Sequence, residues 1–285
     1  MSVVVTGATG HLGRLVVEHL LAGGLPADQV TAVGRNADRL ADLASRGVRT
    51  VAADYSDGPA LEAAFAGADT VLLVSGSEVG RRVEQHRQVI DSARAAGVRR
   101  VVYTSAPHAD TTELALAPDH KATEELVRAS GLAWTILRNN WYTENYVQSV
   151  EQARTTGTIV TSAGAGRVAS APRTDYAAGA AAVLLGGDHD GRVYELSGDV
   201  AWTFEELAAA ASEVLGTPVT VQHVSDDEYR AILVGAGLDE GTAGFVVALE
   251  EGTRRGDLAD ATADLRTLIG RPTTPLVEAL RSALA

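Results

Sequence analysis

Residues 2–13 read SVVVTGATGHLG, and this stretch decides the fold. Three consecutive valines, typical of a buried parallel strand, lead into a Gly-x-x-Gly-x-x-Gly turn that opens a helical pattern at about residues 11–23. Gly7 permits the tight bend, Gly10 lets the backbone approach a pyrophosphate, and Gly13 lets the helix pack against the strand. The free N–H groups and positive dipole at the helix start favour phosphate. The stretch therefore predicts a dinucleotide-binding βαβ unit.

Strand and helix patterns alternate throughout the first half of the chain. This alternation is typical of a Rossmann-type α/β fold, in which helices cover both faces of a doubly wound parallel sheet. The predicted strands are 2–6, 29–34, 48–52, 69–74, 99–104 and 132–137, and the predicted helices are 11–23, 37–46, 58–66, 80–97 and 119–130.

The alternation loosens in the second half. Residues 157–173 are rich in Gly, Ser, Thr and Ala around a short strand at 158–161, and a helix at 174–186 and a strand at 192–197 return to the sheet. A capping-box pattern opens a helix at 204–215, and helical patterns continue to the end. We predict a Rossmann domain of residues 1–156 and 174–198, and a smaller, mostly helical C-terminal substrate domain of residues 157–173 and 199–285.

Composition excludes several classes of protein. There is no cysteine, which rules out disulfides, thiolate metal sites and a cysteine nucleophile, and the histidines lack metal-ligand spacing, so no metal is expected. The net charge is -13, from 37 acidic and 24 basic residues, with no basic run to attract nucleic acid or an anionic membrane. The chain shows neither a signal-peptide pattern nor an apolar run long enough to span a membrane, so we expect a cytoplasmic location.

The end of the second predicted strand selects the cofactor. It reads Gly34-Arg35-Asn36, where an NAD-specific site usually carries a carboxylate. The Arg35 guanidinium can bind a 2′-phosphate, which favours NADPH. The nearby Asp38 keeps NADH possible, and a solvated surface arginine is the alternative interpretation of Arg35.

Two more strand ends border the same crevice, because ligands of open α/β sheets lie outside the carboxyl ends of the strands. Asp54-Tyr55 is expected beside the adenine, and the small residues at 75–77 leave room for ribose and nicotinamide, although each segment can also be a plain loop. The cofactor-binding residues predicted here are Gly7, Thr9, Gly10, His11, Leu12, Gly13, Arg35, Asp54, Ser75, Gly76 and Ser77.

The sequence lacks a standard proton relay. No tyrosine has a lysine four residues on, as many short-chain dehydrogenases require, and no Gly-x-Ser-x-Gly elbow indicates a hydrolase. Reduction of a simple ketone forms a basic alkoxide, whereas reduction of a quinone forms a much less basic hydroquinone anion. Positioning and modest hydrogen bonding then suffice. The sequence suits a quinone-like acceptor, or no reaction at all.

Several motifs carry a family resemblance. The most distinctive is LRNNWYTENY at 137–146, and with the glycine turn it resembles the NmrA-like atypical short-chain dehydrogenases/reductases. The resemblance implies NADPH binding without flavin and direct hydride transfer to a quinone-like small molecule. The other motifs are Gly34-Arg35-Asn36, Ala53-Asp54-Tyr55, Ser77-Glu78-Val79-Gly80, Tyr103-Thr104-Ser105, His108-Ala109-Asp110, His120-x-x-Thr123-Glu124, Arg173-x-Asp175-Tyr176 and Pro272-Thr273-Thr274-Pro275.

The resemblance also implies site residues. Residues 139–146 are expected to line the nicotinamide and substrate pocket, with Asn139 at the cofactor. The implied catalytic residues are Asn140, Tyr142 and His120, and the implied substrate contacts are Trp141, Tyr146 and Arg173. Three alternatives stay open: core packing of the aromatic residues, surface or capping roles for His120 and Thr123, and simple pairing of Arg173 with Asp175.

Two other functions remain compatible with the sequence. A hydroquinone formed by hydride transfer can react with O₂, so the chain can be a flavin-free monooxygenase that tailors polycyclic aromatic polyketides. Alternatively, it can be a non-catalytic regulator that senses dinucleotides, as some NmrA-like proteins do. A homodimer is possible in either case.

Overall fold

A computed structural model describes residues 1–78 and 80–285 and confirms the Rossmann-type fold class. Val79, in one of the family motifs, lies outside the described residues. Seven parallel strands form the sheet in the order β3-β2-β1-β4-β5-β6-β9. In chain order they are β1 (Val3–Val5), β2 (Val30–Gly34), β3 (Arg49–Ala52), β4 (Thr70–Leu73), β5 (Arg100–Ser105), β6 (Ala133–Asn139) and β9 (Arg192–Leu196).

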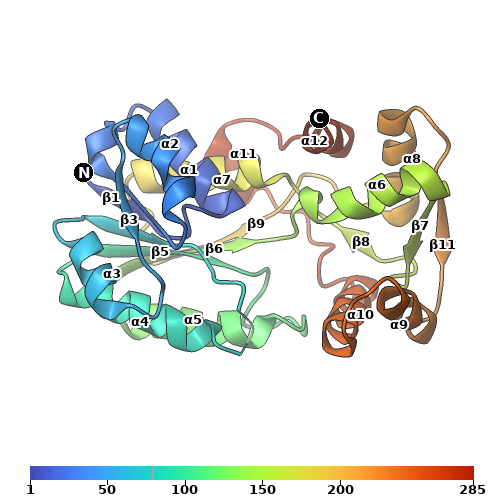
Figure 1. Cartoon of the computed structure of the whole chain (residues 1–285), viewed down its shortest axis with the longest axis horizontal. Helices are drawn as coiled ribbons and strands as arrows, with labels where there is room; N and C mark the ends of the chain where they lie inside the picture. The colour runs from blue at the N-terminus through green and yellow to red at the C-terminus, as the bar shows by residue number, and fades with distance from the viewer. Residues whose placement is uncertain (79) are drawn as a thin grey trace.

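Helices cover both faces of this sheet (Figure 1). Alternate strand residues serve opposite layers: Val3 and Val5 pack into one core, and Val4 into the other. One layer contains α1 (His11–Ala22), α2 (Ala37–Ser45), α7 (Arg173–Leu185) and α11 (Asp264–Ile269), and the other contains α3 (Gly58–Phe65), α4 (Arg82–Ala95) and α5 (Ala117–Ala129). A short 3₁₀ helix, η1 (Ala27–Gln29), precedes β2.

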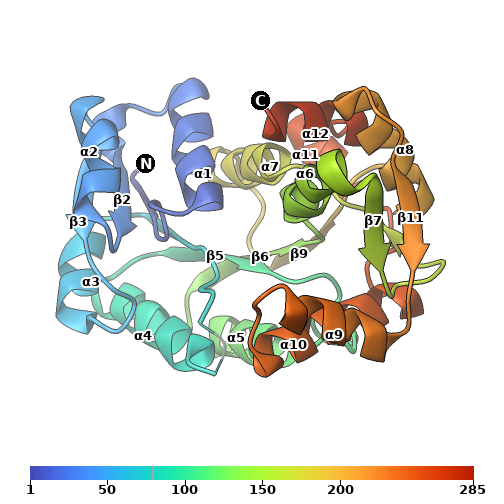
Figure 2. The same cartoon turned by 45° about the vertical axis from the view of Figure 1, so that its right-hand side comes forward.

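The remaining elements form a separate lobe beside the sheet (Figure 2). Its core contains a cluster of three aromatic rings among aliphatic side chains, and we call this core the aromatic core and the lobe the aromatic lobe. Tyr146 lies edge-on to Trp202 and Phe204, with ring centroids 4.9 and 5.9 Å away. The lobe comprises η2 (Thr143–Tyr146), α6 (Val147–Thr156), β7 (Thr158–Thr161), β8 (Arg167–Val168), β10 (Trp202–Thr203), α8 (Phe204–Leu215), β11 (Thr220–His223), α9 (Asp226–Gly235), α10 (Glu240–Arg255) and α12 (Leu276–Ala283). Strand β8 pairs with β10 and β7 with β11, each as a two-stranded sheet.

Several elements of the lobe were not expected from the sequence, and α6 and β11 show why. Helix α6 buries only Val150 and Ala153, so its apolar face is too narrow for a clear helical pattern. Strand β11 is mostly exposed and lacks the alternation of a half-buried strand. The domain boundaries stay a prediction, and packing bears on them: Leu265 of α11 joins the sheet core, whereas α6 joins the aromatic core.

The glycine turn fixes helix α1 against the sheet. Gly7 adopts φ +62°, a left-handed conformation that side chains rarely tolerate. A Cβ at Gly13 would lie 2.4 Å from the carbonyl oxygen of Gly7, because the first turn of α1 touches the backbone that precedes it. Within the described residues, no helix combines the length and apolarity needed to cross a bilayer.

We predict that Gly13→Ala destabilises the fold, whereas Gly10→Ala does not. The alanine methyl group at position 13 would meet the backbone of Gly7, which cannot move aside. The free energy of unfolding should therefore fall by about 2–3 kcal/mol. At Gly10 the nearest atom to a new Cβ, the Gly7 carbonyl oxygen, is 3.2 Å away, and the cost should stay below about 1 kcal/mol. Urea unfolding of both variants without ligand checks this difference, and equal stabilities would contradict it.

Candidate cofactor and substrate site

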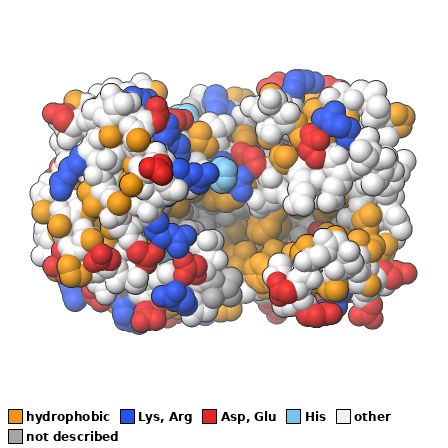
Figure 3. All heavy atoms as spheres, viewed as in Figure 1, with side chains coloured by type: hydrophobic (Ala, Val, Ile, Leu, Met, Phe, Trp, Pro, Cys, Tyr) orange, Lys and Arg blue, Asp and Glu red, His pale blue; other side chains and the backbone are white. Residues whose placement is uncertain are grey.

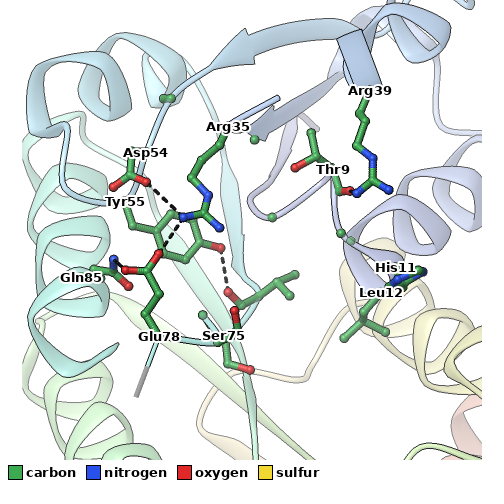
Figure 4. Close-up of a pocket in the computed structure, with 18 of the residues that line it drawn as sticks. Thr9, His11, Leu12, Arg35, Arg39, Asp54, Tyr55, Ser75, Glu78 and Gln85 are labelled. Atoms are coloured by element: carbon green, nitrogen blue, oxygen red, sulfur yellow. Dashed lines mark hydrogen bonds and ion pairs between the residues drawn. The ribbon is translucent and has the colours of Figure 1, made fainter. Parts of the chain in front are cut away.

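A cleft of about 450 Å³ opens where the carboxyl ends of β1–β4 meet. It brings together all the cofactor residues predicted from the strand ends, and Figure 4 shows several of them facing one another. Those residues are Gly7, Thr9, Gly10, His11, Leu12, Gly13, Arg35, Asp54, Ser75, Gly76 and Ser77. The cleft also contains Tyr55, Tyr142 and Arg173, which were expected at the site, and the structure adds Arg39, Glu78 and Gln85.

The first turn of α1 offers unused hydrogen-bond donors to this cleft. Arg14 N–H is the first in the helix to find a carbonyl, that of Gly10 at 3.1 Å. Among the described residues, no acceptor is recorded for the N–H groups of His11, Leu12 or Gly13, and Gly10 provides no side-chain cap. Such a helix start is an anion site, so the backbone here fits a pyrophosphate group.

Arg35 reaches the cleft but already has two acidic neighbours. Its Nη1 lies 2.6 Å from Glu78 Oε1 and 3.7 Å from Asp54 Oδ2 (Figure 4). Hydrogen bonds from Ser56, and more weakly the charge of Arg35, hold the pKa of Asp54 below its usual value. A second guanidinium, Arg39, donates to the carbonyl of Thr9 at 3.1 Å. The rim therefore carries two arginines, one of them partly neutralised.

Tyr55 forms the floor of the cleft. Its hydroxyl lies 2.7 Å from both the Thr6 hydroxyl and the carbonyl oxygen of Val74. Burial raises the pKa of Tyr55 well above its ordinary value, so the phenol stays neutral. The ring joins the ends of β1, β3 and β4 and keeps the floor closed.

The peptide group of Gly76 is held from both sides by helix α4. Gly76 N–H donates to His86 Nε2 at 2.9 Å, and Arg82 Nε donates to the Gly76 carbonyl at 2.7 Å. Since Nε2 accepts, the imidazole proton is on Nδ1, 3.0 Å from the Thr123 hydroxyl. Burial, helped by Arg82, lowers the pKa of His86 to about 3. Sequence reasoning missed this pair, although a spacing of four residues places Arg82 and His86 on one face of a helix.

Tyr142 closes the other wall of the cleft. The guanidinium of Arg173 lies over its ring, 4.7 Å from the centroid, and Asn139 Nδ2 donates to its hydroxyl at 3.2 Å. Burial raises the pKa of Tyr142, so its hydroxyl keeps the proton and has one hydrogen to donate. Asn139 does not line the cleft, and its Oδ1 is buried without a partner among the described residues. Its contact is with Tyr142.

Arg173 faces the cleft because other groups hold it there. Its backbone N–H donates to Glu144 Oε1 at 2.9 Å, and its side chain donates to Asn145 at 2.9 Å. Its suggested pairing with Asp175 is wrong: Asp175 is fully buried and accepts from Arg271 and Thr274 N–H, each at 2.6 Å. Those bonds bring the motifs at 173–176 and 272–275 together in space.

Two predicted catalytic residues lie outside the cleft. Asn140 Nδ2 donates to the carbonyl of Leu258 at 3.2 Å, and its Oδ1 accepts from Trp141 N–H, so its amide joins two chain segments. His120 Nδ1 lies 2.8 Å from the Tyr103 hydroxyl, and burial lowers the pKa of His120 to about 3. Neither residue lines the cleft in the described part of the chain. His120 is buried, as is Thr123, so the helix-surface interpretation of both is also wrong.

The predicted substrate contacts Trp141 and Tyr146 line a second cavity, of about 780 Å³. It lies among α6, β7, α9 and α10. The segment 140–146 contributes to both spaces, since Trp141 lines the cavity and its neighbour Tyr142 lines the cleft. Apolar side chains also gather in a hollow between the two halves of the molecule (Figure 3). The alternative interpretation of Tyr146 as a core residue is also correct, since Tyr146 belongs to the aromatic core.

Other family motifs converge on one buried arginine. Arg138 lies 2.7 Å from Glu124 and 2.8 Å from both Asp110 and Glu195. These residues come from β6, α5, β9 and the segment after β5, so the cluster ties together the carboxyl ends of three strands. Among residues 1–78 and 80–285, no group of three potential ligands is placed to hold a metal ion.

Comparison with known proteins agrees with this geometry. Residues 7–185 match a family described as NAD(P)H-binding. The chain belongs to this family, and the predicted NmrA-like membership is confirmed. It is 45% identical to quinone oxidoreductase 2 of Escherichia coli over 98% of this chain and 97% of the relative.

Solved structures give the same result. An E. coli NADPH-dependent quinone oxidoreductase, in complex with NADPH, superimposes with a TM-score of 0.95 at 44% identity, covering 99% of this chain and 100% of that one. The triphenylmethane reductase of Citrobacter sp., in complex with NADP(H), gives 0.94 at 38% identity and covers all of both chains. The likeness spans the sheet and the aromatic lobe together.

We predict that stability decreases as pH falls below about 6.5 because of His86 and His120. Their folded pKa values of about 3 lie below the unfolded value of about 6.5, so the unfolded chain binds more protons between these limits. Each histidine should cost about 2 kcal/mol between pH 7 and pH 5. Urea unfolding across this range measures the slope. His86→Gln, which keeps an acceptor for Gly76, should reduce the slope, whereas the exposed control His11→Gln should not.

Proposed function

We propose that this chain is an NADPH-dependent oxidoreductase that transfers hydride directly to a quinone-like acceptor without a flavin. One observation carries the proposal: the pyrophosphate-fitting turn and the phenol of Tyr142 face the same cleft. The whole-length similarity to the E. coli quinone oxidoreductase supports it.

The cleft divides into parts that match the parts of the cofactor. The N–H groups of residues 11–13 suit the pyrophosphate, and Arg35 with Arg39 suits a 2′-phosphate. Ser75, Gly76 and Ser77 leave room for ribose and nicotinamide, and the clamp by Arg82 and His86 fixes the peptide at Gly76. NADPH, when bound, supplies the hydride.

Tyr142 is the residue that we assign to the acceptor. Asn139 donates to its oxygen, so the phenolic hydrogen is free to bond an oxygen of the substrate. The stacked guanidinium of Arg173 keeps the ring in place and adds positive charge near developing negative charge. A hydroquinone anion needs no stronger acid than this. Asn140 and His120 stabilise the surrounding structure in this scheme, because their polar atoms already have partners.

The alternatives have less support. The relatives compared above are named as a quinone oxidoreductase and a triphenylmethane reductase, so neither the polyketide monooxygenase nor the non-catalytic regulator is favoured. The cytoplasmic location and the homodimer stay predictions.

Steady-state oxidation of NADPH with a panel of benzoquinones and naphthoquinones tests the function. Without added flavin, we expect one hydroquinone per NADPH, with no oxygen incorporated from labelled O₂ into the product. Tyr142→Phe should lower kcat roughly tenfold, the effect of one lost hydrogen bond, while the ring under Arg173 preserves NADPH affinity. Tight NADPH binding with no turnover of any acceptor would instead indicate a regulator, and labelled product a monooxygenase.

We predict that Glu78→Gln strengthens NADPH binding more than NADH binding. Glu78 neutralises Arg35 and would lie near a 2′-phosphate, so loss of its charge should favour NADPH by about 0.5–1 kcal/mol, or two- to fivefold. Calorimetric titration with both dinucleotides measures this ratio. Glu84→Gln, an exposed site on the first turn of α4, is the matched control. An equal change in affinity for NADPH and NADH would show that Arg35 does not recognise the 2′-phosphate.

A further inference from the structure

The cavity in the aromatic lobe has one charged wall residue. Among the described residues that line it, Glu250 is the only acidic or basic side chain. The rest of the lining combines the aromatic rings of Trp141, Tyr146, Phe204 and Tyr229 with aliphatic and uncharged polar side chains. A volume of about 780 Å³ is in the range of small-molecule sites, and such walls suit a flat aromatic ligand.

The two carboxylate oxygens of Glu250 differ in their surroundings. Oε2 accepts from the N–H groups of Ser162 and Ala163, each at 3.0 Å, and from the Thr161 hydroxyl. In the part of the chain that the structure describes, no partner is recorded for Oε1. One oxygen is therefore fixed by the loop after β7, and the other is left for the cavity.

The hydrogen bonds to Oε2 do not fully compensate for the burial of the Glu250 carboxylate. Burial raises the pKa of Glu250 in spite of the bonds from Thr161, Ser162 and Ala163, and the charge of Asp226 adds to the effect. The neighbouring Arg254 pairs with Asp226 at 2.7 Å. A ligand that donates a hydrogen bond to Oε1 would replace solvation that the carboxylate has lost.

We propose that Glu250 selects the substrate by accepting a hydrogen bond, through Oε1, from a hydroxyl or amino substituent on an aromatic acceptor. Anionic substituents are disfavoured at the same point, because the carboxylate repels them and no cation lines the described wall. The identity of this ligand as a hydride acceptor rests on the proposed function. The preference of the cavity for hydrogen-bond donors does not.

Glu250→Gln tests the proposal with little change in shape. The N–H groups of Ser162 and Ala163 require an oxygen at the Oε2 position, so the new amide nitrogen must take the place of Oε1. The variant thus replaces an acceptor that faces the cavity with a donor. Glu251→Gln, the adjacent residue on α10, removes the same charge without touching the cavity and is the control.

The measurement is calorimetric binding of 2-naphthalenemethanol and of its methyl ether to the full chain. Only the alcohol can donate a hydrogen bond, and neither probe accepts hydride, so the result does not depend on turnover. The wild type and Glu251→Gln should bind the alcohol about tenfold more tightly than the ether. In Glu250→Gln the ratio should fall to about one, since an amide donates equally to either oxygen.

Two results would overturn the proposal: the same alcohol-to-ether ratio in the wild type and Glu250→Gln, or no binding of the alcohol by the wild type. If Glu250→Gln folds poorly, the wild type alone still tests the proposal. It should bind 2-naphthoate at least tenfold more weakly than the alcohol, because the carboxylate of Glu250 repels an anion. If the ratio changes as expected but no quinone is reduced, the specificity of the cavity stands and the proposed activity fails.

Discussion

The close contact between Gly13 and the backbone of Gly7 sets the geometry of the whole site. It presses the first turn of α1 against the end of β1, which directs the unpaired N–H groups into the cleft. The same placement of α1 supports α7, whose alanine-rich face packs on it. Helix α7 begins at Arg173, so the contact at the start of the chain also determines where the far wall of the cleft stands.

A second constraint lies at the opposite side of the cleft. Arg138 gathers three carboxylates near the ends of β5, β6 and β9, and the segment that carries Asn139 and Tyr142 follows it directly in the chain. Removing one member of such a buried cluster would leave the others uncompensated. Glu124, which belongs to one of the family motifs, therefore supports the residues that face the ligand.

A feature could be predicted when it depends on residues close together in the sequence, and not when it depends on contacts between distant segments. Local patterns predicted the strands of the main sheet within a residue or two, and the glycine turn with the strand ends predicted most of the cleft. The support of Gly76 by Arg82 and His86, and the position of Glu250, depend on contacts between distant segments, which have no local signature. Asn140 and His120 show the converse: polar residues in a suggestive motif were already satisfied by partners elsewhere in the chain.

The path of the chain between the sheet and the aromatic lobe bears on how the enzyme admits its ligands. The connections 140–142, 169–172, 197–201, 256–263 and 271–275 each pass from one body to the other, and α11 returns to the sheet before α12 rejoins the lobe. Hinged closure normally bends only a few linking residues. Here five connections would have to bend together, which opposes a simple hinge between the two bodies.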